Sequence, residues 1–169
     1  MHPFDEKFDT YVETVLLDWK TPGVVFSVIK NGEYVFVKGY GTRKFGENLP
    51  VNGNTLITIA SCTKSFTAAA VAILVSEEKL SWDDPVKKHI PEFRFSSDFI
   101  TEKTTIRDIL LHRACLPGIF GDLLNPDYSI SDLLRDLQTS KPVCGFREKC
   151  AYSQIGLVQN QRTSSTLTK

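Results

Sequence analysis

Ser61 and Lys64 are the residues whose types and spacing best suit nucleophilic chemistry. A helix turns by about 300° over three residues, so both side chains are predicted to share one face and to reach each other. A serine hydroxyl is a weak nucleophile until a base takes its proton, and a lysine can be that base when burial and a helix N-terminus favour its uncharged form. If Ser61 begins a helix, its backbone N–H lacks an intrahelical acceptor and can face an oxyanion. The pair predicts a nucleophile, a base and half of an oxyanion hole within one turn.

The S-x-x-K spacing alone is weak evidence, because the sequence contains it at three places. These are Ser27 with Lys30, Ser61 with Lys64, and Ser76 with Lys79. The first pair lies on a predicted strand, where an offset of three points side chains to opposite faces. The third lies in the last turn of a predicted helix, where a lysine complements the helix dipole. The alternative for the second pair is that Ser61 only caps a helix while Lys64 extends to water.

The elements around this pair are predicted from residues 55–80. The run reads as a short strand, a tight turn and a long helix that begins at Ser61. From Phe66 to Val75 the helix has almost no polar residue, which predicts a buried helix. We expect this helix to position the chemistry.

Two upstream elements are predicted from periodicity. Between residues 4 and 19 apolar side chains recur every three or four positions, which predicts an amphipathic helix. Two apolar runs, 24–29 and 33–37, flank Asn31 and Gly32, the strongest short signal for a β-hairpin.

Downstream of the central helix the sequence predicts loops and short helices. Pro85 and Pro91 exclude a continuous helix between them. Capping-box patterns begin at Thr105 and Ser129, each followed by a leucine-rich run.

The composition of the chain argues against several classes of partner and predicts the state of its cysteines. The 169 residues fit one domain with a real core. The 20 basic and 20 acidic side chains cancel, which argues against partners such as nucleic acid or an anionic membrane. No signal peptide or membrane-spanning run is visible, so a cytoplasmic location is expected. The four cysteines form no C-x-x-C pattern, so reduced thiols are expected.

The remaining polar candidates are few. Tyr152 could relay a proton beside a Ser/Lys pair, although from the sequence alone a half-buried packing role is the more ordinary one for any of the five tyrosines. His112 with Cys115, and Cys144 with Cys150, match no zinc spacing, so no metal site is predicted. No glycine-rich loop has P-loop or dinucleotide spacing, so no cofactor is predicted.

The order of these pieces resembles the serine β-lactamase and penicillin-binding-protein-like hydrolases. The resemblance runs from about residue 21 to 156, through the segments PGVVFSVIKNGEYVFVKGYG, ASCTKSFTAAAVAILVSEEKLSWDDPV, HIPEF, TTIRDILLHR and FREKCAYSQIG. It is nearest the class C-type branch that includes D-specific peptidases and esterases. The resemblance implies an α+β fold of the penicillin-binding-protein/β-lactamase type. It also implies that Ser61 is acylated, that Lys64 helps take its proton, and that Tyr152 is the partner base.

The chain departs from the family pattern at two points. Gln154 stands where the family has an asparagine, and its extra methylene would shift contacts to a substrate carbonyl or to Lys64. Residues 157–169 contain no K-T-G or H-x-G, the third family motif, which supplies the second oxyanion donor. We therefore expect residues 1–156 to be the N-terminal portion of such a hydrolase domain, lacking the C-terminal strands of its sheet, and residues 157–169 to be a divergent polar tail.

The function expected from the resemblance is hydrolysis of an amide or ester in a small-molecule or peptide acyl substrate. Full activity is not expected, because loss of one oxyanion donor costs on the order of 10²–10³ in rate. Two alternatives stay open: a catalytically inactive homologue that acts as a binding or structural protein, and a fragment with no function of its own. Whether a partner chain supplies the missing strands also stays open.

Overall fold

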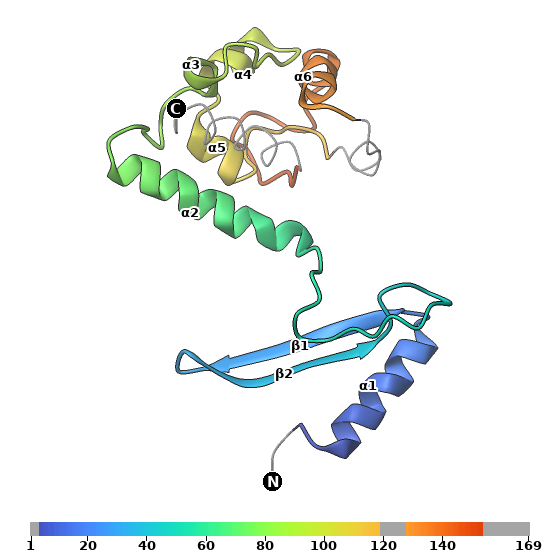
Figure 1. The fold of residues 1–169 in the computed structure, drawn as a ribbon. Helices are drawn as coiled ribbons and strands as arrows, with labels where there is room; N and C mark the ends of the chain where they lie inside the picture. The colour runs from blue at the N-terminus through green and yellow to red at the C-terminus, as the bar shows by residue number, and fades with distance from the viewer. Residues whose placement is uncertain (1–3, 119–127, 154–169) are drawn as a thin grey trace. The chain divides into compact units, whose positions relative to one another are not determined.

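A computed structural model of the protein describes residues 4–118 and 128–153 (Figure 1). The chain divides into two compact units, Met1–Thr58 and Ile59–Lys169. Each unit has its own packing and is described separately.

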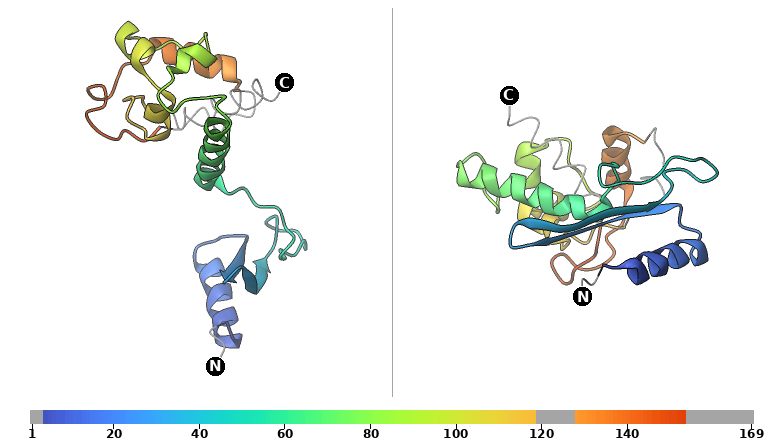
Figure 2. Two further views of the ribbon diagram at one scale, coloured as in Figure 1. Left: turned by 90° about the vertical axis from the view of Figure 1, so that its left-hand side faces the viewer. Right: turned by 60° about the horizontal axis from the view of Figure 1, so that its bottom comes forward.

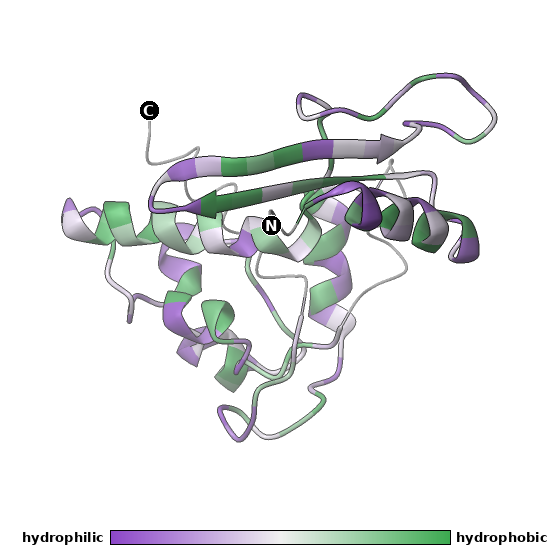
Figure 3. Cartoon of the chain, turned by 90° about the horizontal axis from the view of Figure 1, so that it is seen from below, coloured by the Kyte–Doolittle hydropathy of each residue, from purple (hydrophilic) through white to green (hydrophobic). Residues whose placement is uncertain are grey.

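The first unit begins with α1, Glu6–Asp18, which confirms the predicted amphipathic helix. The Asp5 carboxylate caps the helix by accepting hydrogen bonds from the amides of Lys7 and Phe8, at 3.0 and 3.2 Å. Hydrophilic and hydrophobic residues stripe this helix (Figure 3), and Val12 is its one buried residue.

The predicted hairpin is also confirmed. Strands β1, Gly23–Lys30, and β2, Glu33–Gly41, pair antiparallel and form a two-stranded sheet within the described residues. Asn31 and Gly32 take φ values of 55° and 83°, the left-handed conformation that a two-residue hairpin turn requires.

Aromatic rings join α1 to the hairpin. The Phe8 ring centroid lies 5.5 Å from that of Phe26, 5.9 Å from Phe36 and 6.4 Å from Tyr40. The Tyr40 hydroxyl donates to the Asp9 carboxylate at 2.5 Å. One helix and one sheet face therefore share a small aromatic core.

The entry to the second unit differs from the prediction. Residues 55–59 form no strand, because no strand of the described residues pairs with this segment, and Leu56 is 98% exposed. The chain turns at Ala60, whose φ is 44°, into a short 3₁₀ helix, η1, Ala60–Cys62, and continues as α2, Thr63–Ser76. Ser61 thus lies in η1, two residues before the first residue of α2.

Helix α2 was predicted to be a buried helix, and within its own unit it is buried only in part. Val71 and Leu74 are buried, but Phe66 is 69% and Ile73 57% exposed. Within the second unit only one side of the helix is covered. On that side Val71, Leu74 and Val75 of the helix pack with Leu80, Trp82, Ile106 and Leu110.

Short helices build the rest of the second unit (Figures 1 and 2). They are α3, Val86–His89; α4, Asp98–Lys103; α5, Ile106–Leu110; and α6, Ile130–Thr139. Both capping boxes, at Thr105 and Ser129, are confirmed. Helix α4 was not predicted, since its start depends on one capping hydrogen bond from the Ile100 amide to Ser97.

The main hydrophobic core lies among these short helices. It consists of Val86, Ile90, Phe93, Phe95, Ile100, Ile109, Ala114, Leu116, Leu133, Leu134 and Leu137. Because α5 gives Ile109 to this core and Ile106 to the cluster beneath α2, it connects the two. In the described part of the chain, no helix combines the length and apolar character needed to cross a bilayer.

Candidate active site

The structure brings together three of the predicted site residues. The Lys64 Nζ donates to Ser61 Oγ at 3.2 Å, and the Tyr152 hydroxyl oxygen lies 2.6 Å from the same Oγ. The Nζ of Lys64 also lies 4.9 Å from the centroid of the Tyr152 ring. The serine hydroxyl therefore contacts two groups that can exchange a proton with it. Tyr152 is 43% exposed, so solvent reaches the site.

Helix geometry explains one half of this arrangement. Ser61 is the second residue of η1 and Lys64 the second residue of α2, so the three-residue spacing spans the junction of the two helices. The first backbone hydrogen bond of η1 runs from the amide of Cys62 to the carbonyl of Ile59. The Ser61 amide precedes that bond and lies before the first turn closes.

Backbone pairing explains the other half, because Tyr152 is 91 residues from Ser61. Residues 143–151 run alongside residues 112–115. Their bonds run from the amides of Val143, Arg147 and Ala151 to the carbonyls of Cys115, Arg113 and His112, at 3.1, 3.0 and 2.7 Å. This pairing carries Tyr152 to the chain turn that follows α5.

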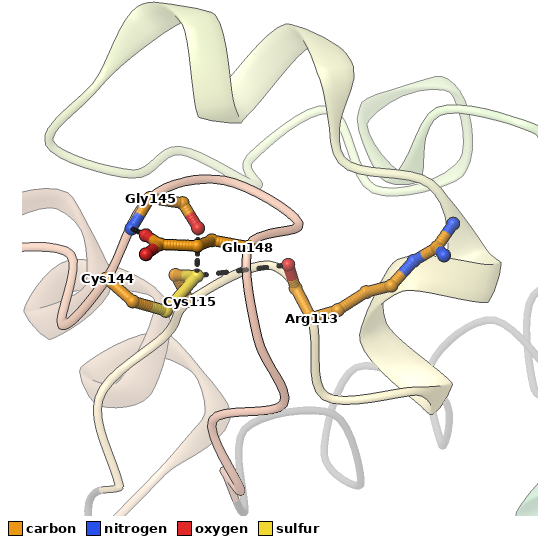
Figure 4. Close-up of a disulfide and its surroundings, with 5 residues drawn as sticks. All are labelled: Arg113, Cys115, Cys144, Gly145 and Glu148. Carbon is orange, nitrogen blue, oxygen red and sulfur yellow. Dashed lines mark hydrogen bonds between the residues drawn. A yellow bond between two sulfur atoms is a disulfide. The ribbon is translucent and has the colours of Figure 1, made fainter.

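A disulfide joins the same two segments and corrects the expectation of four reduced thiols. Cys115 and Cys144 are bonded, with their Cα atoms 5.4 Å apart (Figure 4). They stand 29 positions apart in the sequence, so no local spacing could indicate the pairing. Cys62 and Cys150 are free and exposed.

A buried carboxylate anchors the Tyr152 segment to α5. Asp108 has no exposed side-chain surface, and its Oδ1 accepts from the Nε atoms of Arg113 and Arg147, at 2.7 and 3.0 Å. Its Oδ2 accepts from Arg147 Nη2 at 2.7 Å and from the Thr105 amide at 3.0 Å. Burial raises the pKa of Asp108, but these hydrogen bonds outweigh burial and lower it to about 2.

His112 lies beside Tyr152, where sequence reasoning did not place it. The two ring centroids are 4.6 Å apart, and the Ser153 amide lies 3.3 Å from His112 Nδ1. Burial lowers the pKa of His112, and the positive charge of Lys64 lowers it further. From the sequence, His112 was considered only as a metal ligand, and its spacing matched no zinc site.

The last predicted site residue, Gln154, lies outside the described residues, and its substrate-binding role stays a prediction. Its neighbour Ser153 is held by a hydrogen bond from its Oγ to the carbonyl of Pro117, at 3.0 Å. In the described ranges, 4–118 and 128–153, no three His, Cys, Asp or Glu side chains gather in a way that could hold a metal ion.

Sequence reasoning also missed the second role of Asp108. The capping-box pattern located this residue, and the structure confirms its hydrogen bonds to Thr105. Its two arginine partners come from positions 5 and 39 residues further along the chain. The one indication in the sequence was that Asp108 lies inside a leucine-rich run, where a buried carboxylate needs a charged or hydrogen-bonding partner.

Comparison with known proteins matches this chain to one family. The family model described as Beta-lactamase matches residues 4–160. Among curated relatives, Protein flp of Staphylococcus aureus (strain MRSA252) is 28% identical over 97% of this chain and 34% of its own length. The unguisins hydrolase ungD' of Aspergillus campestris is 30% identical over 98% of this chain and 32% of its own length. This chain therefore spans about a third of the length of these curated relatives.

Solved structures agree on the fold. The octameric penicillin-binding protein homologue from Pyrococcus abyssi superposes with a TM-score of 0.79 at 27% identity, over 96% of this chain and 39% of that one. FmtA from Staphylococcus aureus superposes with a TM-score of 0.77 at 22% identity, over 99% of this chain and 44% of that one, a likeness of fold alone. The resemblance read from the sequence is confirmed, and the chain belongs to the β-lactamase family.

Proposed function

We propose that this chain carries the nucleophile-bearing part of a serine hydrolase, in which Ser61 forms an acyl-enzyme with an amide or ester substrate. The observation that supports this proposal most directly is the position of Ser61 Oγ, 2.6 Å from the Tyr152 hydroxyl and 3.2 Å from Lys64 Nζ. A serine used only as a helix cap would bond a backbone amide instead. Here its oxygen contacts two side chains able to move a proton.

The proposed acylation step follows from these contacts. As Ser61 Oγ bonds to the acyl carbon, its proton passes to the Tyr152 oxygen or the Lys64 nitrogen and then to the departing amine or alcohol. When the Tyr152 oxygen is the acceptor, it is a phenolate before the transfer, and Lys64 in its charged form stabilises that negative charge until the proton arrives. Water then attacks the acyl-enzyme, its proton follows the same route in reverse, and Ser61 is regenerated. The Ser61 amide, at the start of η1, would be one oxyanion donor.

The substrate class is proposed from the relatives. One is named a hydrolase of unguisins, and a structural neighbour is a class C β-lactamase in complex with cefoxitin. We propose a small-molecule or peptide acyl substrate for this chain, with β-lactam amides among those to be tried first.

Chromogenic substrates test the proposal. Release of p-nitrophenol from p-nitrophenyl acetate and opening of nitrocefin would be measured for the wild type and for Ser61→Ala. Ser76→Ala is the matched control, because it removes the hydroxyl of another S-x-x-K serine, one that bonds only a carbonyl of its own helix. We expect wild type and control to turn over at least one substrate and Ser61→Ala to lose roughly 10³-fold or more.

Two results would count against the proposal. Equal rates in wild type and Ser61→Ala would show that Ser61 is not the nucleophile. Saturable binding of nitrocefin without any turnover would instead support the inactive, binding homologue.

A further inference from the structure

His112 contacts the chain on both sides of Tyr152. Its carbonyl oxygen accepts from the Ala151 amide at 2.7 Å, and its Nδ1 lies 3.3 Å from the Ser153 amide. Its ring centroid lies 4.6 Å from that of Tyr152 itself. One residue thus holds the residue before Tyr152, the residue after it, and the tyrosine ring.

The hydrogen bond to Ser153 fixes the protonation of the imidazole. A backbone N–H can only donate, so Nδ1 must be the acceptor and must carry no proton. In the neutral ring the proton is then on Nε2. A second proton would have to enter at Nδ1, which would break this bond and turn two donors towards each other.

Several ionisable groups surround the ring. Lys64 approaches from α2, and Tyr152 from the paired segment. Asp108 on α5 lines the same small cavity as His112, and its carboxylate is already occupied by Arg113 and Arg147. Lys64 and burial both oppose a positive charge on His112, so the neutral ring is the form favoured near neutral pH.

We propose that His112 is a positioning residue that holds Tyr152 against Ser61 through its neutral imidazole, and that protonation of His112 releases Tyr152. This inference rests on the proposed function for its catalytic consequence, but its structural part is independent of turnover. A protonated ring loses the Ser153 bond and brings a second positive charge next to Lys64. Acylation of Ser61 should therefore weaken as His112 gains its proton.

Nitrogen-15 NMR of the whole chain tests the structural part. The chain has three histidines, so the His112 signals are assigned by their disappearance in His112→Asn. We expect the Nε2–H tautomer, and we expect the Ser153 amide and the Tyr152 ring signals to titrate with the midpoint of His112. An Nδ1–H tautomer, or a Ser153 amide signal that does not change as His112 titrates, would overturn the inference.

Two variants test the catalytic part through the rate of fluorophosphonate labelling between pH 5 and 8. His112→Asn keeps an acceptor near the Nδ1 position, cannot gain a proton there, and suits the backbone, because asparagine tolerates the φ of 54° at this residue. His112→Phe keeps a ring without the acceptor. We expect the labelling rate of the wild type to decrease as the pH is lowered. The part of this decrease that comes from protonation of His112 should be absent in His112→Asn. His112→Phe should label roughly fivefold more slowly than the wild type at pH 7.5.

The outcomes separate the two proposals. Matching pH profiles for wild type and His112→Asn would overturn the positioning role while leaving Ser61 as nucleophile. If neither the wild type nor any variant is labelled, while NMR shows the Nε2–H tautomer and the Ser153 and Tyr152 signals titrate with His112, the proposed function is overturned. His112 then remains the group that positions Tyr152.

Discussion

Replacing Asp108 with asparagine should destabilise the second unit. The carboxylate is buried and receives hydrogen bonds from Arg113, Arg147 and the Thr105 amide. Asparagine keeps the size and one acceptor oxygen but turns an NH₂ group towards two guanidinium groups. The perturbation removes the charge from the cluster with little change in volume.

The magnitude follows from the pKa. Asp108 has a pKa of about 2 in the fold, against about 3.9 in an unfolded chain, and each unit is worth about 1.4 kcal/mol. The arginine partners are 37% and 43% exposed, so water screens part of this interaction and we expect a loss of about 1–2 kcal/mol at pH 7. Because the folded pKa is the lower one, the wild-type contribution is present above about pH 4 and is lost as pH falls towards 2.

Urea unfolding would be followed by Trp82 fluorescence in a Trp19→Phe background, since Trp82 lies in the second unit and Trp19 in the first. Asp132→Asn is the matched control, because Asp132 occupies the same capping-box position in α6 but is 30% exposed. Asp108→Asn should lose more than the control, and the difference from wild type should shrink between pH 6 and pH 3. Equal losses in the two variants, or a pH-independent difference, would refute the reasoning.

Three further predictions concern the core, the thiols and the first unit. Phe93→Ala should cost about 3–5 kcal/mol in the free energy of unfolding measured with urea, since the ring has no exposed surface; a loss under 1 kcal/mol would contradict the assigned core. Thiol titration of the denatured, unreduced chain should count two thiols, rising to four after reduction, because Cys115 and Cys144 are bonded; four before reduction would disprove the disulfide. Burial and the hydrogen bond to Asp9 raise the pKa of Tyr40 to about 12. Absorbance at 295 nm should therefore show one tyrosine that ionises about two pH units above an ordinary tyrosine, and this transition should be absent in Tyr40→Phe. The stability that Tyr40 contributes is lost as pH rises from about 10 to 12.

The predictions that succeeded depended on local signals. Helix α1 follows from apolar spacing, the hairpin from Asn31 and Gly32, and the two capping boxes from pairs three residues apart. In each case the residues that determine the structure are neighbours in sequence, so the local sequence is sufficient to predict the element.

The predictions that failed depended on distant partners. An apolar run at residues 55–59 becomes a strand only if another strand pairs with it, and α2 is buried only where another element covers it. The Cys115–Cys144 bond and the Asp108–Arg147 pair join residues 29 and 39 positions apart. Spacing cannot reveal such contacts without the fold.

The site shows the same division. The helical spacing was enough to pair Ser61 with Lys64. The sequence offered Tyr152 as a candidate proton relay, but its role as the partner base of Ser61 came from the family resemblance, and His112 was considered only as a metal ligand. Both belong to segments that are distant in sequence and are joined by backbone hydrogen bonds between residues 143–151 and residues 112–115.

Labelling of Ser61 by a fluorophosphonate, read by intact mass and peptide mapping, tests the central claim most directly. The wild type should gain one adduct, mapped to Ser61, and the adduct should be absent from Ser61→Ala and strongly reduced in Lys64→Ala. An unlabelled wild type, or an adduct on another residue that persists in Ser61→Ala, would contradict the account.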